Sequence, residues 1–496
     1  MIRKRMSIAL QTLIFSFQKL LQQAYRLTFK WLIMNKIPHL LLFIILPLVL
    51  SCGEGFLKLD PYMEVSSTSA IQTTKDLETA LNGCYAQLRS PGLFGRNLPV
   101  IGDLAADNVY LSTRNSGKYQ AFEQHTITSN NAEYRTIWFE AYTAILRANN
   151  VINSTLPVDF VISQLKGEAY ALRALMYFTL VKTFARPYTY NPTMPGIPLV
   201  FQDNPTLRPP RNTIEQVYKA ITADLDSASQ MMTADQGSAR FSRYAAIALH
   251  AKARFYMGDY TRALMLASQV IRQSGYKLLP YTSFIQYWSS PVSQTPGQRL
   301  ETLFEVSADA SLNASSNELG YMYQQTAYGD LLAGGSLTSL YGSGDIRRKL
   351  FILGKRESAE NPAWIVNKYP TGHSDWDDKK ILRLSELYLI AAEAAFRIGN
   401  EQEALTYLNL LISEREPSLQ YTNSGQALLE AIITERRKEL AFEGDRFHDL
   451  NRLNREIHRM DGQFKAIIPF SNSSRIGPIP EVEIIENENL VQNDGY

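Results

Sequence analysis

The chain has 496 residues, of which 45% are hydrophobic and 20% are charged, and its formal net charge is +2. A chain of this length and apolar content can bury a large core. Residues 1–51 contain seven Lys and Arg and no acid, so residues 52–496 have a net charge of −5. A mildly acidic chain without a basic tract argues against nucleic acid as a partner.

The N-terminal segment has the pattern of a bacterial lipoprotein signal. Lys36 precedes an apolar run at residues 40–50, which Ser51 and Cys52 follow. The run is shorter than the roughly 20 residues of a membrane-spanning helix, so an anchor helix or a buried strand is the weaker alternative. We therefore predict cleavage before Cys52, lipidation of Cys52, and a mature chain held to a membrane by several acyl chains.

The cysteines and the region upstream of the signal support two further interpretations. Once Cys52 is lipidated, Cys84 has no partner, which excludes a disulfide framework and a cysteine-ligated metal site. Residues 1–33 are basic, and signal peptides seldom begin so far upstream of their apolar run. We interpret Met34 as the true start and residues 1–33 as upstream read-through. The alternative is a basic amphipathic segment on a membrane surface.

Helical periodicity dominates the rest of the chain and predicts four helix pairs. The paired segments are 77–88 with 136–153, 167–174 with 214–231, the two halves of 244–271, and the two halves of 386–412. The last two pairs have small residues in the first helix, a turn at Gly258 or Gly399, and Ala-Leu in the second. This is the pattern of a tetratricopeptide unit, but the two turns lie far more than one repeat of roughly 34 residues apart.

Three long insertions separate these pairs, at residues 90–134, 187–211 and 278–379. The third is rich in Tyr and Trp, with Gly and Ser between the aromatic residues. Loops of such length are usually functional or disordered. The sequence therefore predicts an all-α fold, in which tetratricopeptide-like pairs form a scaffold and long irregular insertions carry a ligand site.

No catalytic signature stands out. The chain lacks a His-Glu-x-x-His zinc helix, a Gly-x-Ser-x-Gly elbow, a phosphate-binding loop with Lys and a dinucleotide fingerprint. His250 lies on a core-like helix, and the acidic stretch 375–378 lacks the spacing of a calcium loop, so we expect a structural histidine and a solvated turn. Acid pairs for glycoside hydrolysis need not be close in sequence and stay open. We expect no catalytic residue, no cofactor and no metal.

Charged residues recur every three to four positions near the C-terminus. They are Glu435, Arg436, Glu439, Glu443, Arg446, Asp449 and Arg452. This spacing suits ion pairs that join one helix to its neighbours, and the long side chains also cover apolar surface. We expect these residues to stabilise the scaffold rather than to contact a ligand.

The same stretch, residues 432–452, resembles the Glu-Arg-Arg-x-Glu-Leu…Glu-Gly-x-Arg-x-x-Asp-Leu-x-Arg signature of SusD/RagB proteins. The ending, from Pro478-Ile479-Pro480 to Gln492-Asn493-Asp494-Gly495-Tyr496, is similar to the family's closing motif, with Asp494 in place of its Pro. Segments 382–394 and 138–149 match as well. The resemblance covers essentially the whole mature chain. It implies one SusD-like domain at 52–496, with an N-terminal part to about 275 and a C-terminal part from about 276.

The resemblance implies a lipoprotein of the Bacteroidota that is lipid-anchored in the outer membrane and faces the cell exterior. Such proteins cover a SusC-like TonB-dependent transporter, capture a nutrient that is usually an oligosaccharide, and pass it inward without chemistry. Glu54 and Asp60 only weakly match the acidic export signal after the lipid cysteine, so a periplasmic orientation stays open. Peptide capture of the RagB type is the alternative function, and a surface glycoside hydrolase is a remote one.

The family has no sequence motif for its ligand residues, so we choose candidates by their location in the insertions. Aromatic faces suit sugars, because their apolar surface stacks on a ring while polar side chains bind hydroxyls at the rim. We expect Trp364 and Trp376 to lie in the core, since both flank predicted helices. The predicted ligand residues are Tyr287, Trp288, Tyr321 and Tyr323 from the third insertion and Tyr119, Arg114 and Asp107 from the first.

Overall fold

The computed structural model describes residues 19–26, 71–204, 206–289, 295, 297–309, 314–370 and 377–496. The chain divides into two units, Met1–Ser69 and Ala70–Tyr496. In the first unit, residues 19–26 form an exposed helix. The expected start Met34, the lipid site Cys52 and the boundary between residues 51 and 52 lie outside the described residues. Within the described ranges, no helix is both long enough and apolar enough to cross a membrane.

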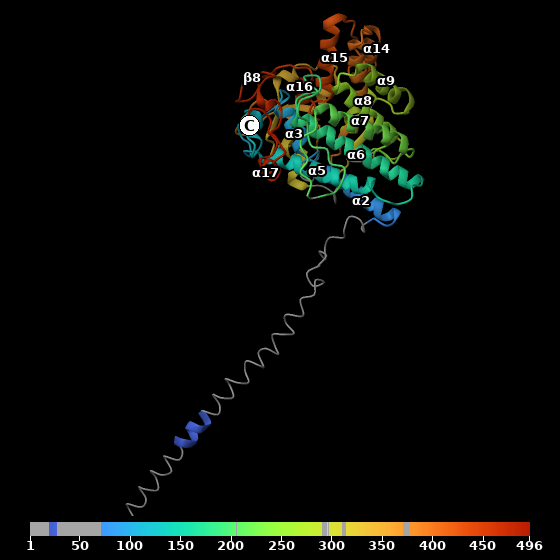
Figure 1. Cartoon of the computed structure of the whole chain (residues 1–496). Coiled ribbons are helices and arrows are strands. Elements are labelled where there is room, and N and C mark those ends of the chain that lie inside the picture. The colour runs from blue at the N-terminus through green and yellow to red at the C-terminus, as the bar shows by residue number, and fades with distance from the viewer. Residues whose placement is uncertain are drawn as a thin grey trace, which may run out of the picture. The chain divides into compact units, whose positions relative to one another are not determined.

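The second unit is built on four pairs of helices (Figure 1). The pairs are α2 (Thr74–Leu88) with α5 (Ala132–Ile152), α6 (Phe160–Phe184) with α7 (Ile214–Met231), α8 (Arg243–Tyr256) with α9 (Tyr260–Gln273), and α13 (Leu384–Arg397) with α14 (Glu401–Ile412). Each pair also packs against the next, through α5 on α6, α7 on α8 and α9 on α13. This continuous stack confirms the predicted all-α scaffold of four tetratricopeptide-like pairs.

The last two pairs have the same turn. Gly258 and Gly399 have φ angles of +75° and +86°, in the left-handed region that glycine enters without steric cost. The residue that follows each glycine caps the next helix: Asp259 accepts the N–H of Arg262, and Asn400 accepts the N–H of Glu403. The glycine and the cap together explain why each pair turns where the sequence predicts.

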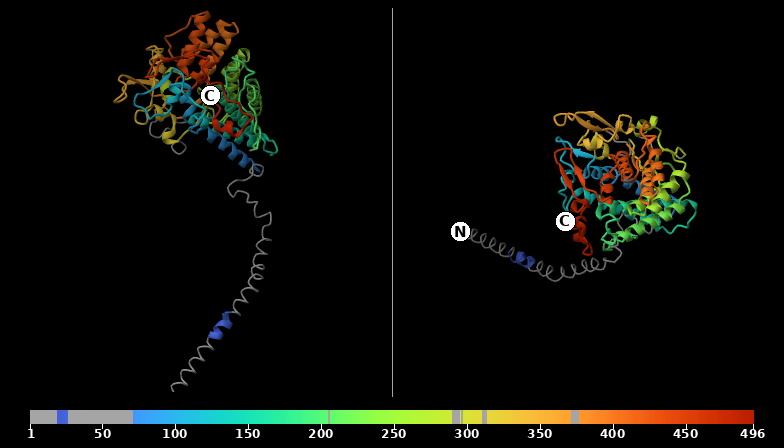
Figure 2. Two further views of the ribbon diagram at one scale, coloured as in Figure 1. Left: turned by 60° about the vertical axis from the view of Figure 1, so that its left-hand side comes forward. Right: turned by 90° about the horizontal axis from the view of Figure 1, so that it is seen from above.

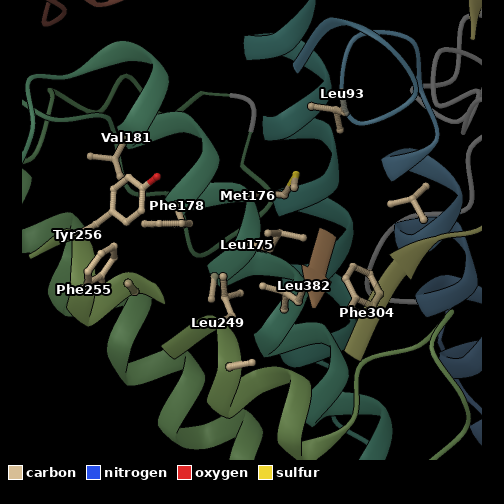
Figure 3. Close-up of a cluster of buried hydrophobic side chains, with 14 of the residues drawn as sticks. Leu93, Leu175, Met176, Phe178, Val181, Leu249, Phe255, Tyr256, Phe304 and Leu382 are labelled. Carbon is tan, nitrogen blue, oxygen red and sulfur yellow. The ribbon is translucent and has the colours of Figure 1, made fainter. Parts of the chain in front are cut away.

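The core runs between the helix pairs and the strands (Figure 3). Leu175 and Phe178 of α6 lie beside Leu249 of α8, and Leu382 and Phe304 of two strands complete the same cluster. The alanines that line α8 and α13 are buried, so neighbouring helices approach closely. Cys84 is 1% exposed in this core, as expected of a small apolar residue.

The insertions and the C-terminal part contain short elements that periodicity alone did not predict. The strands pair antiparallel as β1 (Val109–Leu111) with β3 (Leu331–Ala333), β2 (Thr302–Val306) with β6 (Lys379–Arg383), β4 (Phe351–Gly354) with β5 (Ala363–Val366), and β7 (Ile457–Arg459) with β8 (Ala466–Ile468). The short α-helices of the insertions are α3 (Asn97–Leu104), α4 (Gln120–Glu123), α10 (Phe284–Trp288), α11 (Leu319–Tyr323) and α12 (Gly335–Thr338). The C-terminal part adds α15 (Gly425–Glu439), α16 (Arg446–Arg452) and α17 (Glu481–Glu486), and 3-10 turns cover Tyr281–Ser283, Ser315–Asn317, Ile346–Leu350 and Ser473–Arg475.

The insertions gather on one side of the second unit. In both views of Figure 2, the yellow and orange third insertion lies beside the blue-cyan first insertion, and the green helices lie opposite. The β1–β3 pairing joins these two insertions directly, although their partner residues lie more than 200 positions apart in the chain. Residues from two distant segments therefore share one surface.

The charged residues near the C-terminus form a buried network that confirms the predicted scaffold role. We call it the C-terminal network; its members are Glu435, Arg436, Glu439, Glu443, Arg446, Asp449 and Arg452, together with the partners Asp107, Glu301, Arg347, Lys368, Arg383, Glu386, Glu393 and Arg415. Glu439 accepts hydrogen bonds from Arg383, Arg415 and Arg347 at 2.8, 3.0 and 3.1 Å. Arg452 likewise binds both oxygens of Glu393 at 2.8 Å. These pairs fasten α15 to β6 and α16 to α13.

Candidate ligand-binding site

The first and third insertions meet at the loop that follows β1. Val109 pairs with Ala333 and Leu111 with Leu331, which places residues 112–118 beside the segment that leads into β3. The N–H of Ser112 donates to the carbonyl oxygen of Asp330 at 2.8 Å and so extends the ladder by one step. The backbone thus fixes the loop of the first insertion against residues 321–330.

Two partly exposed tyrosines lie at this junction. The ring centroids of Tyr321 and Tyr328 are 6.1 Å apart and the rings are inclined by 63°. The N–H of Gly329 donates to the carbonyl oxygen of Tyr321 at 3.1 Å, which holds the two tyrosine positions together. The Nζ of Lys118 lies 4.1 Å from the centroid of the Tyr328 ring. The junction therefore presents two aromatic rings and a cation at the surface.

Arg356, from the β4–β5 hairpin, ties these parts together. Its Nη2 donates to the carbonyl oxygens of Tyr328 and Arg114, at 2.6 and 3.0 Å, and its Nη1 donates to the side chain of Gln325 at 3.0 Å. Burial and the nearby charge of Arg114 lower the pKa of Arg356 from its ordinary value. We call Arg114, Lys118, Tyr321, Tyr328 and Arg356 the Tyr321–Tyr328 surface.

Two acids near this surface accept hydrogen bonds from the loop at residues 112–118 of the first insertion. Asp330 accepts the N–H of Ser116 at 3.0 Å, and its second oxygen accepts the Ser116 hydroxyl. Glu360 accepts the hydroxyl of Ser112 at 2.7 Å and the N–H of Thr113 at 2.6 Å. Both carboxylates thus shape the loop that carries Arg114 and Lys118.

Of the seven predicted ligand residues, Arg114 and Tyr321 belong to this surface. Arg114 is exposed, and its Nη1 donates to the carbonyl oxygen of Glu357 at 3.2 Å. Lys118, Tyr328 and Arg356 were missed. Tyr328 belongs to the aromatic third insertion and Lys118 precedes the chosen Tyr119, but only the strand pairing distinguishes them from their neighbours.

Asp107 is part of the C-terminal network. Arg446 binds its two oxygens at 2.7 and 2.9 Å, and the Nη2 of Arg437 lies 3.5 Å away. Burial alone would raise the pKa of Asp107, but these arginines lower it below its ordinary value. Its carboxylate is committed to the scaffold, so the predicted ligand contact is not available in this structure.

Tyr119 and Tyr323 are buried, with 4% and 0% of their surface exposed. The Tyr119 hydroxyl donates to Asn97 at 2.5 Å and accepts from Arg96 at 2.8 Å. The Tyr323 ring stacks on that of Tyr369, with centroids 6.0 Å apart. Neither tyrosine offers a ring face to solvent in this structure, so the site we propose below does not use them.

Tyr287 and Trp288 belong to a second hydrophobic cluster, built on α10 with Leu279, Phe284, Ile346 and Leu350. Trp288 is 3% exposed, and the Nζ of Lys368 lies 4.2 Å from its ring centroid. Tyr287 is only partly buried, with Lys380 4.8 Å from its ring. Trp288 therefore fills the core, and Tyr287 stays a prediction as a ligand residue.

Three other expectations have structural outcomes. His250 is buried and its Nε2 accepts from Arg254 at 3.1 Å, which fits a structural histidine. The expected solvated acidic turn is wrong for Asp377 and Asp378, which are each 3% exposed, because Asp378 accepts the N–H of Ala308 and the chain enters β6 there. Trp364 is partly buried against Phe351, and Trp376 lies outside the described residues. Among the described residues, no group of three His, Cys, Asp or Glu could hold a metal ion.

Two of the hollows elsewhere in the second unit are large enough or enclosed enough to compare with this surface. An interior cavity of about 70 Å³ between α3, α6, α8 and β6 is lined by Lys182, Lys252, Asp445 and His448, among others. Its volume accommodates several water molecules. A groove of about 310 Å³ runs between α5, the second insertion and α17, with Phe139, Tyr142 and Leu207 in its lining. Neither hollow contains any of the seven predicted ligand residues.

Comparison with known proteins agrees with this architecture. A family model described as "Starch-binding associating with outer membrane" matches residues 56–257, and the SusD family model matches residues 364–496. SusD-like protein P2 of Formosa agariphila is 26% identical and aligns with 92% of this chain and 99% of its own length.

Solved structures show the same fold. A candidate sugar-binding protein from Bacteroides vulgatus is 26% identical with a TM-score of 0.79, covering 86% of this chain and 99% of its own. A SusD superfamily protein from the same species is 27% identical with a TM-score of 0.79, covering 86% and 100%. The helix scaffold with its insertions is thus a SusD-type fold. The chain belongs to the SusD/RagB family, which confirms the resemblance seen in its C-terminal motifs.

Proposed function

We propose that this protein is an outer-membrane lipoprotein that captures a glycan at the Tyr321–Tyr328 surface. The observation that carries the proposal is the pair of partly exposed, mutually inclined tyrosine rings of the third insertion, beside which the first insertion places Lys118. Each ring can stack on the apolar face of a sugar, which contributes about 1 kcal/mol beyond burial of its area. Gln325 and Arg356 lie beside the rings and supply polar groups for sugar hydroxyls.

The family supports glycan capture as the function. Its first matching model is described by starch binding and outer-membrane association, and one similar solved structure is described as a candidate sugar-binding protein. An open surface with two stacking rings implies an affinity between roughly micromolar and millimolar, or about −8 to −4 kcal/mol. Such an affinity suits a protein that must also release its ligand.

In this proposal the protein binds its ligand and passes it on without chemistry. Two carboxylates at this surface, Asp330 and Glu360, accept hydrogen bonds from the loop at residues 112–116, and Asp330 is 1% exposed. An acid pair for glycoside hydrolysis needs carboxyl groups that reach the scissile bond. Because Asp330 and Glu360 are engaged by the loop, we do not propose them as such a pair. Cys52 holds the protein to the outer membrane, facing the exterior, and a SusC-like TonB-dependent transporter receives the ligand.

The test uses residues 53–496, made without the lipid cysteine, in native gels that contain plant, host or microbial polysaccharides. We expect retardation by one class of polysaccharide, and a roughly fivefold weaker affinity after either Tyr321→Ala or Tyr328→Ala. Tyr190→Ala is the matched control, because Tyr190 is 56% exposed and belongs to the second insertion.

Other outcomes assign a different function. Retardation that survives both tyrosine changes would move the site away from this surface. Binding of a peptide mixture without binding of any polysaccharide would favour peptide capture of the RagB type. Release of sugar products from a bound polysaccharide would contradict binding without chemistry.

The anchor and the partner have tests of their own. Mass spectrometry of the membrane form should find acylated Cys52, and co-purification should recover a TonB-dependent transporter.

A further inference from the structure

We infer that the glycan taken by the Tyr321–Tyr328 surface carries anionic groups, either the carboxylates of uronic acids or sulfate esters. This inference rests on the proposed function and names its substrate class. It comes from the three cations around the two rings, Arg114, Lys118 and Arg356, and from the partners that these cations have.

All three cations have neutral partners. Lys118 lies over the Tyr328 ring at 4.1 Å, and Arg114 donates to a backbone carbonyl. Arg356 donates to two backbone carbonyls and to the amide oxygen of Gln325, while its Nε is buried without a hydrogen-bond partner. Over the part of the chain that the structure describes, no ion pair within 4.0 Å involves Arg114, Lys118 or Arg356. None of the three is paired with a carboxylate in those residues, so part of their positive charge remains available to a ligand.

The acids near these cations interact with other groups instead of with the three cations. Asp330 and Glu360 accept from the serine and threonine groups of the 112–116 loop. Glu357 lies 3.8 Å from Lys355 in an exposed pair. Asp330 and Glu360 offset part of the positive charge at Arg356, so Lys118 and Arg114 are the cations most open to a ligand.

Ring stacking and charge act together in this arrangement. Lys118 covers one face of the Tyr328 ring, so a sugar that stacks on the neighbouring Tyr321 ring, 6.1 Å away, places its substituents near the ammonium group. A carboxylate or sulfate oxygen there gains a charge-assisted hydrogen bond, about twice as strong as a neutral one. Because residues 52–496 carry a net charge of −5, a polyanion gains little from the protein as a whole and needs such a local group of cations.

The experiment compares polymers that differ only in charge. Residues 53–496 are titrated by calorimetry with dextran and dextran sulfate, and with methyl-esterified and de-esterified homogalacturonan, at low and high salt. We expect at least one anionic polymer to bind roughly tenfold more tightly than its neutral counterpart. Preference for dextran sulfate alone assigns sulfate esters, and preference for de-esterified homogalacturonan alone assigns carboxylates.

Two charge-matched variants separate a built site from general attraction. The double change Arg114→Gln with Lys118→Gln should reduce the anionic advantage, which is the ratio of anionic to neutral affinity, roughly tenfold. Lys219→Gln with Lys277→Gln removes the same charge at exposed positions elsewhere and should not change this ratio. Equal losses in both variants would mean non-specific attraction and overturn the inference.

The two proposals fail in different ways. Binding of neutral polymers as tightly as their anionic counterparts, lost on Tyr328→Ala, would overturn the anionic preference and leave glycan capture intact. No binding of any of these polymers, or of the wider polysaccharide panel, would overturn both.

Discussion

The C-terminal network and the Tyr321–Tyr328 surface use cations in opposite ways. In the network, Arg347, Arg383 and Arg415 surround Glu439, and each arginine is at most 2% exposed. At the surface, Arg114 and Lys118 are at least partly exposed and have only neutral partners. Charges that satisfy each other hold a fold together, whereas charges left with neutral partners remain available to a ligand. The predictions below test this difference, from the largest expected effect to the smallest.

Acid should remove much of the network's stabilisation. Burial alone would raise the pKa of Glu439 and Glu393, but the neighbouring arginines lower both below the ordinary value. A group whose pKa is lower in the folded state stabilises the protein above its unfolded pKa, near 4, and loses that contribution as pH falls. A strongly paired carboxylate contributes about 2.6 kcal/mol in this way, so urea unfolding should show a steep loss of stability below about pH 4.

Several buried acids contribute with the opposite sign, and Asp103 is one of them. Burial raises the pKa of Asp103 to about 7, so its share of the stability falls as pH rises from about 4 to about 7. The net loss from the network should therefore be clearest below pH 4, where Asp103 is protonated in both states. Stability that stays constant between pH 5 and pH 3 would contradict the assigned pairing.

Breaking the network at its centre should have the next largest effect. Glu439→Ala removes the one carboxylate that Arg347, Arg383 and Arg415 all contact, and loss of a partner from a buried ion pair costs about 3–5 kcal/mol. Glu430→Ala is the control on the same helix, since Glu430 pairs with Arg455 near the surface and should cost less than about 1 kcal/mol. Urea unfolding with equal losses in the two variants would show that burial of the network does not decide its contribution.

Tyr321 and Tyr323 allow the comparison within one short helix, α11. Tyr323 is fully buried against Tyr369 and Phe442, so Tyr323→Ala should lower the free energy of unfolding by about 3–5 kcal/mol. Tyr321→Ala should lower it by less than about 1 kcal/mol and act on glycan affinity instead. Thermal unfolding and the gel assay measure both quantities, and a binding loss confined to Tyr323→Ala would reverse the assignment.

The same two tyrosines show how much of the structure can be predicted from the sequence. The four helix pairs follow from local signals, such as the Gly-Asp-Tyr turn at Gly258, because a helix buries the face that its own spacing defines. The charged network could be expected from its spacing. Nothing local distinguishes Tyr321 from Tyr323, since both are tyrosines in an aromatic insertion.

The remaining site residues depend on contacts between distant segments. The β1–β3 register places Lys118 near Tyr328, and a two-stranded ladder of three residues has no sequence signal of its own. Arg356 joins the surface from a third segment, through carbonyls at Arg114 and Tyr328. Asp107 shows the reverse case, in which a polar residue in the right insertion turns toward the scaffold.

The smallest effect on stability is expected at Lys118, and Lys368 is its matched partner. Each ammonium group lies close to a ring centroid, at 4.1 Å for Lys118 over Tyr328 and 4.2 Å for Lys368 over Trp288. Lys368 also binds Glu443 at 2.7 Å in the interior, where burial lowers its pKa to about 8.

Lys118→Gln should therefore lower the free energy of unfolding by about 0.5–1 kcal/mol, the usual contribution of a cation near an exposed ring. Lys368→Gln leaves the carboxylate of Glu443 with one buried partner fewer and should cost about 3 kcal/mol or more. Urea unfolding of both variants at pH 7 measures the difference. Similar losses would mean that the ring contact alone sets the contribution of each lysine, and the contrast between paired and unpaired cations would then not extend to stability.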